Sequence, residues 1–179
     1  AQLPIVVFAN ACLGLVLAVR GEYGTSREHT KAARAAIPAT GMQTFTGMTR
    51  VADGVLALCN GEWDEACTQY GELHKYLTQT GEVSGIIHWR ADEIEALLRA
   101  GRRELAAQRY AELTTTLESE GPGERASAAR VGALLAPPDR AEALFERALE
   151  LHRGSPAVFE RARTELCWGE WLLEQGRPA

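Results

Sequence analysis

The sequence lacks several features that whole classes of protein require. Its 179 residues carry a net charge of −5, so it lacks the positive surface with which proteins replace the counterions of nucleic-acid phosphates. Its four cysteines include no close pair, which argues against a disulfide framework. No phosphate-binding loop, zinc-protease motif, paired-cysteine motif or nucleophile-elbow motif occurs. The sequence therefore predicts neither an enzyme of these classes nor any cofactor or metal site.

The opening stretch lacks charge altogether. Residues 1–19 contain no acidic or basic side chain, and a membrane span or signal segment is the alternative to a buried helix. Pro4 and Asn10 interrupt the stretch, and no basic residue precedes it. We favour a buried helix from Leu3 to Arg20, because the glycines described below fall on its register.

Strand signals are also scarce, since few segments alternate apolar and polar residues, whereas Ala, Leu, Glu and Arg are abundant and favour helices. Breaks at glycine and proline separate segments of helical length and predict about nine helices. Capping patterns predict helix starts at Thr25, Asp139 and Ser155. The chain is therefore predicted to be all-α.

A repeat of about 35–40 residues organises these helices. Turn positions fall at Gly21, Gly61, Gly101, Ala136 and Gly176. Most copies have a small residue seven positions earlier, an alanine five positions later and an aromatic residue nine positions later. The small residues are Gly14, Gly54 and Gly169, whereas Ile94 and Ala129 stand at this position in the other two units. The aromatic residues are Tyr70, Tyr110 and Phe145, with Thr30 as the exception.

This pattern predicts antiparallel helix pairs that bury their apolar faces by stacking. The segment Gly61–Ala66, of sequence GEWDEA, and its spacing to Gly54 and Tyr70 resemble the tetratricopeptide repeat, although that family's usual unit has 34 residues. The resemblance implies a right-handed solenoid in a single domain of residues 1–179. Its units are expected at residues 3–40, 43–82, 84–120, 123–153 and 155–179. Because both ends interrupt a unit, we expect the chain to be a fragment of a longer array.

Other conspicuous side chains have structural explanations. Cys12, Cys59 and Cys167 are interpreted as small buried residues of first helices. Cys67 and His74 lie two turns apart and could share a face, but packing is favoured over metal binding there. Trp168 and Trp171 are interpreted as packing residues rather than a ligand cage.

The concave face of such a solenoid is lined by the first helix of each pair. The register of the tetratricopeptide repeat places a set of polar side chains on this face. The candidate partner-binding residues are His88, Glu95, Arg130, Arg163 and Glu170.

The last segment, from Arg161 to Leu172, is similar to a stretch of large LuxR-type (MalT-like) bacterial transcriptional regulators. The resemblance implies a cytoplasmic, non-catalytic sensor region whose groove binds a peptide, a protein or a small effector. DNA would be contacted only through a flanking domain absent from this chain, no membrane is expected, and a homo-oligomer is allowed. The alternative is a stand-alone tetratricopeptide-like scaffold unrelated to transcription.

Overall fold

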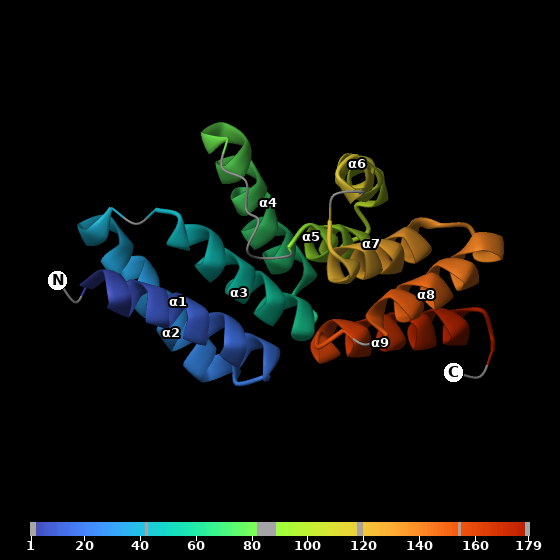
Figure 1. Ribbon diagram of the computed structural model, residues 1–179, viewed down its shortest axis with the longest axis horizontal. Helices are drawn as coiled ribbons and strands as arrows, with labels where there is room; N and C mark the ends of the chain where they lie inside the picture. The colour runs from blue at the N-terminus through green and yellow to red at the C-terminus, as the bar shows by residue number, and fades with distance from the viewer. Residues whose placement is uncertain (1–2, 42, 82–88, 118–119, 154, 178–179) are drawn as a thin grey trace. The chain divides into compact units, whose positions relative to one another are not determined.

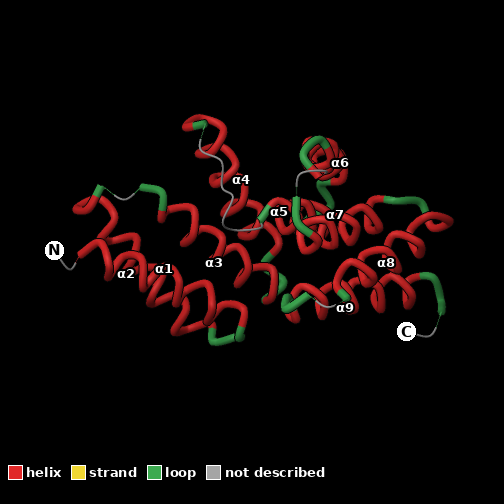
Figure 2. The backbone as a smooth tube through the Cα atoms, in the orientation of Figure 1, coloured by secondary structure: helices red, strands yellow, loops and turns green. Residues whose placement is uncertain are grey.

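The computed structural model describes residues 3–41, 43–81, 89–117, 120–153 and 155–177. Over these ranges the chain forms nine helices and no strand, an all-α repeat fold as predicted (Figures 1 and 2). The helices are α1 (Leu3–Val19), α2 (Tyr23–Thr40), α3 (Phe45–Cys59), α4 (Trp63–Thr80), α5 (Arg90–Arg99), α6 (Arg103–Thr114), α7 (Pro122–Leu135), α8 (Pro138–His152) and α9 (Val158–Glu174).

The chain divides into two compact units, residues 1–96 and 97–179, and α5 spans the boundary in the sequence. In the first unit, α1 packs on α2 and α3, and α3 packs on α4. In the second unit, α7 packs on α8 and α9, while α6 packs on α7 (Figure 1). Each unit therefore builds its interior from neighbouring helices, as expected for helical repeats.

Glycine ends the first helix of most pairs in the way the repeat predicts. Gly21, Gly61, Gly101 and Gly176 have φ values of 77°, 73°, 73° and 69°, in the left-handed region that side chains disfavour. The fourth turn differs, because Ala136 is extended with φ −71° and ψ 157° and is followed by a proline. That turn starts the next helix through Pro137 and Pro138, so it needs no left-handed residue.

Small residues bring the two helices of a pair together, also as predicted. A Cβ atom placed on Gly14 would lie 2.6 Å from Cγ2 of Thr30, and one placed on Gly54 would lie 2.5 Å from Cζ of Tyr70. Thr30 and Tyr70 are fully buried. Thr30 therefore occupies in the first repeat the place that an aromatic ring takes in the second.

The fourth repeat departs from the predicted register. Ala129, which stands where other repeats have the close-packed glycine, is only half-buried. The close approach on α7 is instead made by Gly132, where a Cβ atom would lie 2.4 Å from the hydroxyl oxygen of Tyr110 on α6. This contact joins α7 to the preceding helix rather than to its own partner α8.

Two of the predicted helix starts were wrong. Thr25 lies inside α2, which begins at Tyr23, and Asp139 lies in the first turn of α8 rather than at its cap. The third prediction came close, since the hydroxyl of Ser155 accepts a hydrogen bond from the N–H of Ala157 at 3.2 Å, one residue before α9. The cap positions are taken by residues nearer the turns, Glu22 before α2 and the extended Pro137 before α8.

The tryptophans of α9 serve packing, as predicted. Phe145 of α8 is fully buried and stacks on Trp168 with a centroid separation of 6.1 Å, and Trp171 lies 6.0 Å from the same ring. Together with Ala133 and Cys167 these rings form one hydrophobic cluster in the core of the second unit.

Candidate functional site

The structure places the five predicted groove residues in different surroundings. His88 lies outside the described residues. Glu95 belongs to the first unit and is buried, with 7% of its surface exposed. Arg130 lies on α7, and Arg163 and Glu170 lie on α9, all in the second unit.

Arg130 and Arg163 are brought together by Glu160, a residue that sequence reasoning did not select. Arg130 donates to the Glu160 carboxylate at 2.7 Å, and Arg163 donates to its other oxygen at 3.3 Å. The Arg130 side chain is completely buried, whereas 27% of the Glu160 side chain is exposed. The hydroxyl of Ser127 also donates to the carboxylate, at 3.3 Å. This network fastens α7 to α9.

The electrostatics of the network follow from this geometry. Burial raises the pKa of Glu160, but the positive charges of Arg130 and Arg163, with hydrogen bonds from Arg130 and Ser127, outweigh it and lower the pKa to about 2. The carboxylate is therefore ionised at any ordinary pH.

His152 extends the network towards the end of α8. Its Nε2 lies 3.1 Å from the hydroxyl of Thr164, which itself donates to the carbonyl oxygen of Glu160 at 3.0 Å. Since that hydroxyl has one proton to give, His152 must donate through Nε2. Burial, followed by the charge of Arg130, lowers the pKa of His152, so the ring is held neutral.

Glu170 is held in a similar way. It accepts a short hydrogen bond from Arg99, within the second unit, and Arg99 also contacts the sulfur of Cys167 at 3.8 Å. Arg130, Arg163 and Glu170 thus balance charges inside the unit. These internal ion pairs are a sufficient reason for the three charged side chains, so their role in binding a partner stays a prediction.

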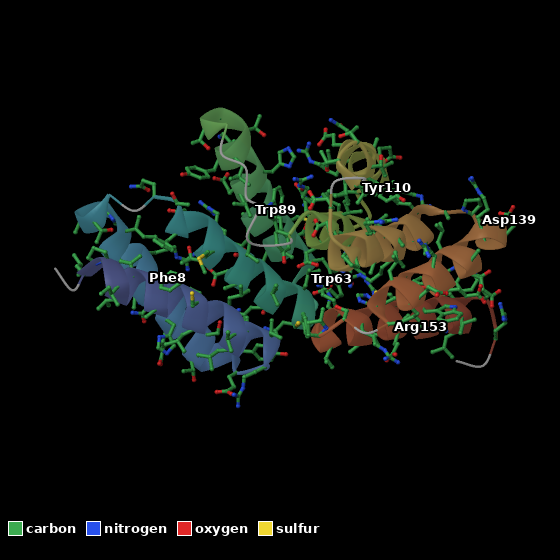
Figure 3. All side chains as sticks on the ribbon, viewed as in Figure 1. Phe8, Trp63, Trp89, Tyr110, Asp139 and Arg153 are labelled. Atoms are coloured by element: carbon green, nitrogen blue, oxygen red, sulfur yellow. The ribbon has the colours of Figure 1, made fainter. Side chains whose placement is uncertain are left out.

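A second surface of the same unit lies between α6 and α8 and was missed by the sequence reasoning. Two adjoining hollows, of about 560 and 400 Å³, share Tyr110 and Leu144 in their walls. We call the pair of hollows the α6–α8 groove, and Figure 3 shows Tyr110 and Asp139 on its helices. Its lining residues are Tyr110 from α6, Leu117 from the turn after α6, Arg125, Ala129, Gly132 and Leu135 from α7, Ala136 and Pro137 from the turn before α8, and Asp139, Arg140, Ala143, Leu144, Arg147 and Leu151 from α8. The signal that could have found it is the basic and small residues at helical spacing on α7 and α8.

The first unit exposes a different kind of surface on α1. Val7, Ala11, Gly14 and Ala18 are buried on one side of this helix. The other side carries large apolar side chains that are 37–68% exposed, and we call it the apolar α1 face. Its members are Leu3, Ile5, Val6, Phe8, Leu13, Val16 and Val19.

The cysteine predictions hold in part. Cys167 is buried as expected, but Cys12 is only partly buried and Cys59 is exposed at the end of α3, where the helix runs out into the turn. His74 lies 3.2 Å from the Glu93 carboxylate and edge-on to Trp89, so its contacts are those of a packed residue. Within the described ranges, no three His, Cys, Asp or Glu residues form a group that could hold a metal ion.

None of the helices in the described part of the chain combines the length and the apolar character needed to cross a bilayer. Searches with protein-family models, curated proteins and solved structures give no match to this chain.

Proposed function

We propose that the chain is a non-catalytic helical-repeat module that binds another protein or a peptide. The observation that carries the proposal is the apolar α1 face. An ordinary protein surface carries single, scattered apolar residues, whereas α1 exposes seven large apolar side chains along one helix. Apolar patches of this kind mark interaction sites. Because the face has no charged residue, it fits an apolar protein surface, such as the helix of another repeat.

We further propose that the module is the sensor region of a LuxR-type transcriptional regulator in the cytoplasm. The support is the resemblance of the Arg161–Leu172 segment, which forms most of α9. In this role a peptide, protein or small effector bound by the repeats would shift the regulator between two arrangements. A stand-alone scaffold with the same interaction faces is the alternative.

Site-directed photo-crosslinking tests the interaction module. A benzophenone amino acid replaces Phe8, which is 51% exposed, in the full-length gene product inside its host cell. We expect one defined cross-linked polypeptide whose attachment site maps to an apolar helix surface. The matched control carries the probe in place of Lys31, an exposed residue of α2 in the same unit. Equal cross-linking from both positions, or none from position 8, would refute the proposal.

The assignment to a transcriptional regulator is tested separately by reading the gene on both sides of this segment. We expect an ATPase module before it and a DNA-binding helix-turn-helix after it. A gene without the helix-turn-helix would refute the proposal of a transcriptional regulator and would favour the stand-alone scaffold.

A further inference from the structure

The α6–α8 groove has a regular arrangement of basic and apolar side chains along α8. Arg140, Leu144, Arg147 and Leu151 follow one another at intervals of four, three and four residues, so they lie on one helix face. Both leucines are half-buried, whereas both arginines are exposed. This wall of the groove therefore alternates guanidinium groups with apolar contact area.

The floor of the groove is open because α7 presents small residues to it. Arg125, Ala129, Gly132 and Ala136 follow the same spacing, so one basic residue leads into three small ones. Tyr110 reaches over Gly132 from α6, and burial raises the pKa of its phenol. The phenol therefore stays protonated at neutral pH and can donate a hydrogen bond inside the groove.

The charge of the groove is opposite to that of the chain as a whole. Its lining has three arginines, Arg125, Arg140 and Arg147, against one carboxylate, Asp139, whereas the chain carries a net charge of −5. Within the described residues no ion pair engages these three arginines, in contrast to Arg130 and Arg163 in the same unit. Three such cations around an apolar floor complement a ligand that combines negative charge with apolar side chains.

The dimensions of the groove suit a peptide. Its floor follows α7, whose 14 residues span about 21 Å at 1.5 Å per residue. This length matches about four turns of a bound helix, or about six extended residues. A nucleic-acid backbone, which is negative at every phosphate, is matched less well, because the lining includes the carboxylate of Asp139 beside its arginines.

We propose that the α6–α8 groove binds an acidic amphipathic peptide segment, whose apolar residues cover Leu144 and the ring of Tyr110 and whose carboxylates meet Arg125, Arg140 and Arg147. This inference rests on the proposed interaction function and specifies the chemistry of the partner segment that binds one surface of the chain. It uses no residue of the apolar α1 face.

The test begins with selection from a displayed library of random peptides of about 16 residues, roughly four helical turns, against the full chain. The best binders are then synthesised with a fluorescent label and measured by anisotropy. The groove variant carries Arg140→Glu and Arg147→Glu. The control variant carries Arg153→Glu and Arg161→Glu, which make the same change in net charge at exposed arginines of the same unit outside the groove. A single-stranded oligonucleotide is measured in parallel.

We expect the selected peptides to combine Asp or Glu with Leu or an aromatic residue at helical spacing. The groove variant should weaken their binding about tenfold or more, and the control variant less than threefold, because close charge pairs act at the surface they line. Added salt should weaken binding to the parent chain. Circular dichroism verifies that each variant is folded, and Arg125→Glu provides a second groove variant from α7.

Three results would overturn the inference. In the first, no selected peptide binds the chain. In the second, the selected peptides show no acidic bias, or both double variants weaken their binding equally. In the third, the oligonucleotide binds more tightly than the peptides and its binding depends on the groove arginines. None of them affects the cross-link expected from position 8, so the inference and the proposed function fail separately.

Discussion

Tyr70 and Tyr110 hold the same position in successive repeats, nine residues after a turn glycine, yet the two units use them differently. Tyr70 is fully buried over Gly54, and its hydroxyl lies 3.5 Å from the Asp92 carboxylate. Tyr110 is half-buried, approaches Gly132 and forms a wall of the α6–α8 groove. The comparison teaches that the same repeat position can supply a buried packing residue in one unit and a groove-lining residue in the other.

The units also differ in how they use charge. The first unit begins with a helix that has no charged residue and exposes seven large apolar side chains. The second unit buries Arg130 completely and neutralises it with Glu160. The first unit also buries carboxylates, those of Asp92, Glu93 and Glu95. The contrast therefore lies in the uncharged helix of the first unit and the completely buried arginine of the second.

The largest effect is expected for Glu160→Ala in the second unit. The substitution leaves the buried guanidinium of Arg130 without its carboxylate, and breaking a buried pair in this way costs about 3–5 kcal/mol. Urea denaturation followed by tryptophan fluorescence measures the free energy of unfolding. Trp168 and Trp171 report on this unit.

The control for that prediction is Glu165→Ala, five residues later on α9. Glu165 pairs with Arg161 at 2.8 Å, but both side chains are about half exposed. Such surface pairs contribute about 0–1 kcal/mol. If the two substitutions have equal effects, the network does not stabilise the second unit as proposed.

Gly54→Ala is expected to have the next largest effect, in the first unit. The new methyl group would lie within 2.9 Å of three atoms of the buried Tyr70 ring, and overpacking of this kind costs about 1–3 kcal/mol. The loss appears as a lower midpoint of urea denaturation. Gly71→Ala on α4 is the control, because nothing lies within 4 Å of its added methyl group and alanine favours a helix by about 1 kcal/mol. A stabilising effect at both positions would refute the close packing.

Gly132→Ala should have a smaller effect, about 1 kcal/mol, because the ring that it meets is half-buried and can move outwards. The nearest atom is the Tyr110 hydroxyl oxygen, so Tyr110→Phe should restore part of the lost stability. The equivalent rescue by Tyr70→Phe should fail in the first unit, since ring carbons of Tyr70 make the contact there. Thermal denaturation of the two double variants measures this difference. Equal rescue in both units would remove the distinction between the two tyrosines.

Much of the fold could be predicted because the repeat is written in local sequence. Gly21, Gly61 and Gly101 end helices through their backbone conformation, and Gly54 pairs with Tyr70 at a fixed distance along the chain. Both signals depend on residues close in sequence. Helical periodicity and these glycines were therefore sufficient for the all-α repeat.

The candidate site was harder to predict, because its contacts join residues far apart in the sequence. Glu160 meets Arg130 across 30 residues, and Arg99 meets Glu170 across 71 residues. A repeat register places an arginine on a helix face but does not say which carboxylate it meets. The α6–α8 groove could not be predicted for the same reason. Its Gly132 on α7 contacts Tyr110 on the preceding helix α6, whereas the repeat predicts a contact with its own partner α8.

The smallest effect concerns pH and again belongs to the second unit. Because the folded state lowers the pKa of His152, the unfolded chain binds a proton at a higher pH than the folded one. Stability should therefore fall as the pH drops below about 6.5, the ordinary value for histidine. His152→Gln keeps a donor to Thr164 but cannot titrate, so its unfolding free energy should be flatter between pH 6.5 and about 5. Below about pH 4.5 both proteins should lose further stability, since the pKa of Glu160 is lowered to about 2 in the folded state. If the variant kept the slope of the parent chain above pH 5, another group would control stability there, and the neutral buried histidine would no longer distinguish this unit.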